Sequence, residues 1–197
     1  MKKYQIIYAD PPWEYKNKRE FINKTAGAIS ITKMGRLNYP QMKLEQIKGL
    51  PIKDIADENC ALFLWTTTPY LEKSFEVIKS WGFEYKTIGF IWLKTWGNKR
   101  TLEEYLTSHY GMNYYTKLQF ELCLLAIKKR MKPISHKVSG QIIASRTKHS
   151  EKPEIVRDRI VELFGDIPRI ELFARQKTEG WDVWGNEVES DINLATH

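Results

Sequence analysis

The chain has 197 residues, of which 42% are hydrophobic and 28% are charged, and its formal net charge is +7. This length and composition exclude a disordered or fibrous chain and favour one globular domain with a full core. Two cysteines are too few for a disulfide framework or a zinc site. No apolar run reaches the roughly 20 residues of a membrane span, and the N-terminus lacks a signal-peptide pattern. The positive charge favours a polyanionic partner such as nucleic acid.

The predicted elements alternate between short apolar strands and amphipathic helices. In chain order we expect a strand at 4–9, a helix at 44–48, a strand at 61–67 and a helix at 69–80. These are followed by strands at 87–94, 120–127 and 141–144, a helix at 153–164 and a last strand at 169–174. Phe75 and Ile155 are expected among the core-facing residues of the longer helices. Strands that are apolar throughout and separated by helices are typical of an α/β fold, with a mostly parallel sheet covered by helices on both faces.

Two long segments, 14–40 and 96–117, do not follow this rhythm and are rich in polar, basic and aromatic residues. Ligands of α/β proteins bind beyond the carboxyl ends of strands, where both segments begin. We therefore expect a single domain, 1–197, in which these segments are substrate-binding loops; the alternative is that one of them is only a surface excursion. The residues expected to contact nucleic acid are Tyr15, Lys16, Lys18, Arg19, Tyr39, Lys99 and Arg100.

The sequence Asp10-Pro11-Pro12-Trp13 follows the first strand directly and has the composition of a catalytic loop. An amine conjugated to an aromatic ring is a poor nucleophile, and acceptors on its two N–H bonds favour the tetrahedral geometry that it needs. Asp10 supplies one acceptor and the carbonyl of Pro11 the other, while the two prolines restrict the backbone. Trp13 is expected to offer a flat face to an extruded base. The alternative is a strand-ending turn with a buried tryptophan.

Several separate segments carry a family resemblance. They are YADPPW at 8–13, LFLWTT at 62–67, FIWLK at 90–94, HSEKPE at 149–154, ELFAR at 171–175 and GWDVWGNE at 180–187. In this order they resemble the MT-A70 family of adenine-N6 methyltransferases. The resemblance implies a Rossmann-like methyltransferase fold, with the catalytic motif N-terminal to the cofactor segment, and S-adenosyl-L-methionine as methyl donor. It agrees with the absence of a G-x-G-x-x-G motif from the sequence.

The resemblance also implies roles for individual residues. Asp10 and Pro11 would lie beside the methyl group, and Lys152 would pair with the carboxylate of the cofactor. Phe173 and Arg175 would line its ribose and adenine region, and Asn186 and Glu187 would bind the sugar hydroxyls. Simpler interpretations stay open: a first-turn helix residue for Lys152, a core residue for Phe173, a turn for Asn186 and an N-cap for Ser150.

The reaction that these residues predict is methylation of adenine N6 in DNA. The same reaction on RNA is the nearest alternative, followed by a catalytically inactive nucleic-acid-binding subunit of the same fold. Methylation of cytosine N4 or of a protein amide is disfavoured, because such enzymes usually open the motif with Asn or Ser and this chain has Asp10. We expect a cytoplasmic enzyme without a metal ion, and the sequence leaves a homodimer open.

Overall fold

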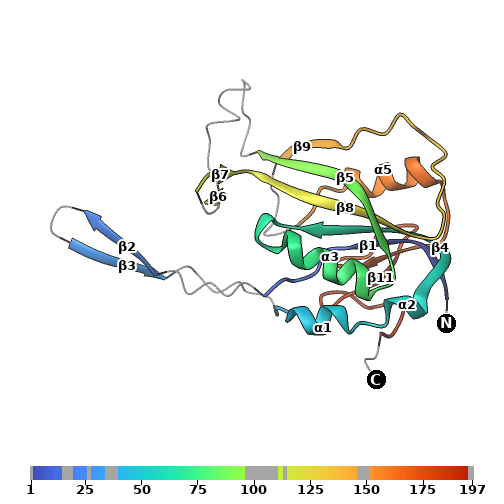
Figure 1. Cartoon of the computed structure of the whole chain (residues 1–197), viewed down its shortest axis with the longest axis horizontal. Helices are drawn as coiled ribbons and strands as arrows, with labels where there is room; N and C mark the ends of the chain where they lie inside the picture. Colours follow the sequence, from blue (N-terminus) through green and yellow to red (C-terminus); the bar gives the residue numbers. More distant parts are fainter. Residues whose placement is uncertain are drawn as a thin grey trace.

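The computed structural model describes residues 2–14, 20–25, 28–33, 40–95, 111–112, 115–145 and 151–194. Its centre is a seven-stranded sheet in the order β11-β10-β1-β4-β8-β5-β9 (Figure 1). These strands are β1 (Tyr4–Ala9), β4 (Ala56–Thr66), β5 (Glu84–Thr95), β8 (Phe120–Lys128), β9 (Gln141–Ser145), β10 (Arg169–Leu172) and β11 (Asp182–Trp184). All neighbouring strands are parallel except where β8 runs antiparallel to β4 and β5. The mostly parallel sheet is confirmed.

Helices cover both faces of this sheet, as predicted (Figure 1). The helices α1 (Leu44–Lys48), α2 (Ile52–Ile55) and α3 (Leu71–Ser80), with a 3-10 turn η1 (Thr68–Tyr70) before α3, contribute to one hydrophobic cluster. The helix α5 (Ile155–Phe164) contributes to the cluster on the opposite face. Within the described residues no helix is both long and apolar enough to cross a bilayer.

The inward faces of the two long helices differ from the prediction at one residue each. Phe75 is 39% exposed and Ile155 is 44% exposed, whereas Val77 and Val156 are fully buried. In α3 the buried face also contains Ser74, whose hydroxyl donates to Thr66 Oγ1 at 2.6 Å. Because Ser74, Val77 and Ile78 form the buried face of α3, Phe75 lies on its flank.

Two small antiparallel sheets lie within the segments that were predicted to be loops. The strands β2 (Glu20–Thr25) and β3 (Ala28–Lys33) form a hairpin, and β6 (Gly111–Met112) pairs with β7 (Lys117–Leu118). Among the described residues, neither pair belongs to the main sheet, and the hairpin stands apart from it in Figure 1. The sequence pattern missed these strands and also β11, α2 and the first residues of β4 and β5.

The direction of the central strands determines where a ligand can bind. The strands β1, β4 and β10 are parallel neighbours, and Ala9 is level with Leu64 on one side and Leu172 on the other. Their carboxyl ends therefore meet at one edge of the sheet, where the residues that follow β1 lie next to those that follow β10. In α/β folds, ligands usually bind in the crevice beyond the carboxyl ends of the strands, at the point where the strand order reverses.

Candidate active site

A chain of alternating charges crosses the carboxyl edge of the sheet, beginning at Asp10. The ammonium of Lys152 donates to Asp10 Oδ2 at 2.5 Å and lies 3.3 Å from Glu121 Oε2. Glu121 in turn accepts a hydrogen bond from the ammonium of Lys94. Only 7% of the Lys152 side chain and 11% of the Glu121 side chain are exposed, against 25% for Asp10. Of these four charged side chains, Asp10 is thus the one that a ligand can reach most easily.

The pKa values of these groups follow from burial and from their neighbours. Burial raises the pKa of the Asp10 carboxyl above its ordinary value, and the ammonium of Lys152 opposes that rise. Burial also acts to raise the pKa of Glu121, but Lys152 and Lys94 outweigh it and hold this pKa below its ordinary value. Burial acts to lower the pKa of Lys152, but Asp10 and Glu121 outweigh it and raise this pKa, so the ammonium stays charged.

The backbone after Asp10 is fixed by two hydrogen bonds. The N–H of Trp13 donates to the carbonyl of Pro11 at 2.9 Å, and the N–H of Met42 donates to the carbonyl of Pro12 at 2.8 Å. The carbonyl of Pro11 keeps a second lone pair, because a carbonyl oxygen can accept two hydrogen bonds. It can therefore serve as the acceptor that the sequence predicts.

The side chain of Trp13 anchors this loop to the core. It is 4% exposed, its ring stacks on Tyr70 with centroids 5.3 Å apart, and its Nε1–H donates to the carbonyl of Trp65 at 3.3 Å. The hydroxyl of Tyr70 donates to the carbonyl of Glu14. The prediction that Trp13 offers a flat face to an extruded base does not agree with this structure, because Tyr70 and the core already cover the ring. The alternative of a buried tryptophan is the one that the fold selects.

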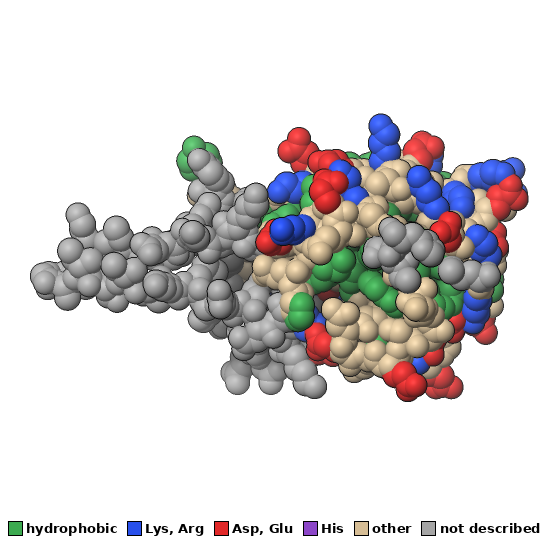
Figure 2. All heavy atoms as spheres, turned by 90° about the horizontal axis from the view of Figure 1, so that it is seen from below, with side chains coloured by type: hydrophobic (Ala, Val, Ile, Leu, Met, Phe, Trp, Pro, Cys, Tyr) green, Lys and Arg blue, Asp and Glu red, His purple; other side chains and the backbone are tan. Residues whose placement is uncertain are grey.

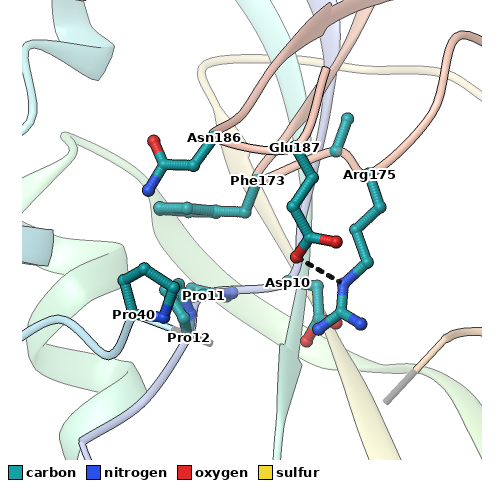
Figure 3. Close-up of a pocket in the computed structure, with 9 residues that line it drawn as sticks. Asp10, Pro11, Pro12, Pro40, Phe173, Arg175, Asn186 and Glu187 are labelled. Atoms are coloured by element: carbon teal, nitrogen blue, oxygen red, sulfur yellow. Dashed lines mark ion pairs between the residues drawn. The ribbon is translucent and has the colours of Figure 1, made fainter. Parts of the chain in front are cut away.

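A pocket opens beside Asp10 and contains most of the residues that were expected to bind the cofactor (Figure 3). Its lining residues are Asp10, Pro11, Pro12, Pro40, Phe173, Ala174, Arg175, Asn186 and Glu187. Figure 3 shows Pro11, Pro12 and Pro40 on one side and Phe173 and Asn186 on the other. Arg175 Nε lies 3.7 Å from Glu187 Oε1. Lys152, the remaining predicted residue, meets the pocket through its ion pair with Asp10.

Phe173 has an unusual backbone conformation at the centre of this pocket. Its φ is +62°, in the left-handed region that bulky residues rarely adopt, and its ring lies edge-on to Trp184 with centroids 5.4 Å apart. β10 ends at Leu172, so Phe173 belongs to the turn and not to the strand. Such strain is kept where the surroundings impose it, and often at binding sites. Phe173 therefore lies in a turn where it lines the pocket and also packs against the core.

Gly185 joins the two halves of the pocket. A Cβ at this position would overlap the carbonyl oxygen of Ala174 and lie 2.8 Å from its backbone nitrogen. The same backbones are connected by a hydrogen bond from Ala174 N–H to the carbonyl of Trp184 at 3.0 Å. Only glycine allows this approach, which places Asn186 and Glu187 beside Phe173.

Replacing Gly185 with alanine is expected to weaken S-adenosylmethionine binding at least tenfold, because the added Cβ must push the two backbones apart. Titration calorimetry on the folded variant measures this loss. Gly49→Ala, at the end of α1 and distant from the pocket, is the matched control and should bind as the parent does. Unchanged affinity in Gly185→Ala would show that the contact between the two segments does not shape the cofactor site.

The structure adds residues to the site and leaves others untested. Glu121 and Tyr70 were missed, although a charged residue inside the apolar run FELCLLAI was a usable signal for the first. The predicted nucleic-acid contacts Tyr15, Lys16, Lys18, Arg19, Tyr39, Lys99 and Arg100 lie outside the described residues, as does Ser150. In the part of the chain that is described, His, Cys, Asp and Glu do not form a cluster of metal-site type.

Comparison with known proteins agrees with this site. The MT-A70 family model matches residues 4–187, which contain Asp10, Lys152 and the whole pocket lining. The chain belongs to the MT-A70 family. MT-A70 membership confirms the predicted methyltransferase fold, S-adenosylmethionine as methyl donor and adenine N6 as the methylated position.

Individual MT-A70 relatives differ in how much of their length the chain spans. The type II methyltransferase M.MunI of Mycoplasma sp is 36% identical over 99% of this chain and 82% of its own length. The N(6)-adenosine-methyltransferase catalytic subunit METTL3 of Homo sapiens is 25% identical over 95% of this chain, which is 28% of its own length. The N(6)-adenine-specific methyltransferase METTL4 of Homo sapiens is 28% identical over 95% of this chain and 38% of its own length.

Proposed function

We propose that this protein transfers the methyl group of S-adenosylmethionine to N6 of adenine in DNA, with Asp10 and the carbonyl of Pro11 as the groups that receive the adenine amine. The observation that carries the proposal is the position of Asp10. It follows β1 at the carboxyl edge of the sheet, lines the pocket, and is partly open to a ligand.

The residues of the pocket fit the methyl donor. Glu187 and Asn186 provide a carboxylate and an amide, which accept and donate hydrogen bonds as sugar hydroxyls require. Phe173 provides an apolar ring for the nucleoside, and Lys152 provides N–H donors next to Asp10 for the cofactor carboxylate. When bound, S-adenosylmethionine supplies an electrophilic methyl group on a positively charged sulfur, which becomes a neutral thioether when the methyl group leaves.

The chain's own part in the reaction is to position the amine and to take its proton. Asp10 and the carbonyl of Pro11 accept one N–H each, which directs the nitrogen lone pair away from them. As the nitrogen gains the methyl group it becomes acidic, and one proton passes to the Asp10 carboxylate. A strong base is not needed, since the amine loses its proton only as the new bond forms. The ion pair with Lys152 opposes the rise that burial causes in the pKa of the Asp10 carboxyl.

We favour DNA over RNA as the substrate because of how much of each relative's length the chain spans. The chain spans most of the length of a type II methyltransferase, but less than a third of the N(6)-adenosine-methyltransferase METTL3. The test offers tritiated S-adenosylmethionine and purified protein to duplex DNA, single-stranded DNA and RNA of matched sequence, and identifies the labelled base by chromatography. Label on adenine N6 of DNA is expected. Label in RNA alone would show that the substrate is RNA and not DNA. No label on any substrate would favour an inactive subunit.

We propose that the segments 14–40 and 96–117 bind the nucleic acid. Residues 15–39 contain six basic residues against the single acidic Glu20, a net charge of +5 out of +7 for the chain. On the face of the molecule seen in Figure 2, by contrast, Lys and Arg side chains are interspersed with Asp and Glu. The positive charge that a phosphate backbone needs is thus concentrated in the first segment.

Replacing Lys16, Lys18, Lys99 and Arg100 together with alanine is expected to weaken DNA binding. Each lost phosphate contact should reduce the slope of log affinity against log salt concentration by about one. Fluorescence anisotropy at several salt concentrations measures both effects, and cofactor affinity should not change. Lys129 and Lys132, which are exposed, form the control pair. If replacing Lys129 and Lys132 changes the salt slope and replacing the four residues of the two segments does not, the segments are not the nucleic-acid site.

We also propose that the enzyme works in the cytoplasm and forms a homodimer. Cys60 and Cys123 are both buried and both free, which fits a reducing compartment.

A further inference from the structure

Tyr70 contacts the catalytic loop (Asp10–Trp13) from the neighbouring strand. β4 is parallel to β1, so the turn η1, which follows β4, lies beside the loop that follows β1. The ring of Tyr70 stacks on that of Trp13 with an angle of 24° between the planes. Its hydroxyl donates to the carbonyl of Glu14, the residue after the loop. One side chain, 8% exposed, therefore contacts two consecutive residues where the chain leaves the loop.

The loop needs such contacts because its two prolines contribute few of their own. Proline has no N–H group, so neither Pro11 nor Pro12 can donate a hydrogen bond. Their carbonyls are held instead, that of Pro11 by the N–H of Trp13 and that of Pro12 by the N–H of Met42. Trp13 is thus bonded directly to the carbonyl that is proposed to receive the adenine amine. A shift of Trp13 would move or release this acceptor.

Tyr70 is itself held by the end of β4 and by α3. Its N–H donates to the carbonyl of Thr67 at 2.9 Å, and the hydroxyl oxygen of Ser74 lies 2.8 Å from its own carbonyl oxygen. The ammonium of Lys73 lies 4.9 Å from the centre of its ring. Both β4 and α3 contribute to the same hydrophobic cluster. The ring of Tyr70 is therefore a fixed support for Trp13.

We propose that Tyr70 is a positioning residue of the methyl transfer, which holds Trp13 and Glu14 and, through Trp13, the carbonyl of Pro11. The proposal rests on the proposed function, in which this carbonyl accepts one N–H of the adenine amine. Reacting groups must keep their geometry closely, and a displacement of about 1 Å can cost about 10²-fold in rate. Tyr70 is not among the described residues that line the cofactor pocket, so its effect should appear in the transfer step and not in cofactor binding.

Two substitutions separate the hydroxyl of Tyr70 from its ring. Tyr70→Phe keeps the stack on Trp13 and loses the hydrogen bond to Glu14, and its kcat is expected to fall about tenfold. Tyr70→Leu loses both contacts, and its kcat is expected to fall about 10²-fold. Initial rates with tritiated S-adenosylmethionine at saturating cofactor and DNA measure kcat. Titration calorimetry should find the cofactor affinity of the parent in both variants.

Tyr85→Phe is the matched control for the loss of a hydroxyl. Tyr85 packs on Phe75, and β5 is separated from β1 by β4 and β8, so this variant should keep the kcat of the parent. A folded Tyr70→Phe enzyme with the kcat of the parent would overturn the proposal. A loss of cofactor affinity as large as the loss of kcat would also overturn it, because Tyr70 would then support the cofactor site.

Hydrogen exchange tests the contact without the reaction. Because the two prolines carry no amide, exchange in residues 10–14 reports on Asp10, Trp13 and Glu14 alone. Mass spectrometry is expected to find exchange in this stretch at least tenfold faster in Tyr70→Phe than in the parent, since local opening controls exchange. Unchanged exchange would exclude the positioning role, whatever the rate of methyl transfer. A parent that methylates no substrate would instead exclude the proposed reaction, so the two can fail separately.

Discussion

Replacing Asp10 with alanine is expected to reduce methyl transfer on the order of 10²-fold or more, because the adenine amine loses one of its two positioned acceptors and the group that takes its proton. Initial rates with tritiated S-adenosylmethionine at saturating cofactor and DNA measure the loss. The rate should fall in kcat, since the acceptor matters most as the nitrogen becomes charged.

The fold is expected to survive this substitution. The ammonium of Lys152 would still lie 3.3 Å from Glu121, so no buried cation is left without a carboxylate. Circular dichroism and cofactor calorimetry check that the variant is folded and loaded. Asp158→Ala, on the exposed side of α5, is the matched control and should keep the rate of the parent. A folded, loaded Asp10→Ala enzyme with near-normal kcat would exclude the proposed role of this carboxylate.

Replacing Lys152 with methionine is expected to cost about 3–5 kcal/mol of the free energy of unfolding, the range found when one partner of a buried ion pair is removed. The ammonium is shared by two carboxylates, and 7% of the Lys152 side chain is exposed, so water cannot take its place easily. Glu121 would keep Lys94, whereas Asp10 would lose its closest cation. Urea unfolding at pH 8 measures the loss, and S-adenosylmethionine affinity should fall in the same variant.

The effect of this substitution should depend on pH with a definite sign. Without Lys152, only the smaller effect of Arg175 opposes the rise that burial causes in the pKa of Asp10. A carboxyl whose pKa is higher in the folded than in the unfolded state stabilises the fold below its unfolded pKa, and this stabilisation is lost as pH rises through the folded pKa. The difference in stability between parent and Lys152→Met should therefore shrink from pH 8 towards pH 5. A difference that is constant over this range would mean that Lys152 contributes by packing and not by charge.

The sequence by itself determined the features that depend on neighbouring residues. The end of β1 before Asp10 was predicted because two prolines cannot continue a strand, and β1 has the bounds expected. The apolar runs gave the remaining central strands except β11, since a strand buried on both faces needs no polar residues. The order of the motifs identified the MT-A70 family, and with it the residues that line the pocket.

The tertiary structure alone decided which side chains are covered and which groups meet. Trp13 is buried because Tyr70, 57 positions further along the chain, stacks on its ring. Glu121 and Lys152 join Asp10 because the antiparallel β8 begins at the edge of the sheet where β1 ends, and the segment before α5 lies at the same edge. Gly185 is required because its backbone touches that of Ala174, and Phe75 is exposed because α3 buries Ser74, Val77 and Ile78 instead. Each of these features depends on contacts between different elements, and residue patterns within one element carry no information about them.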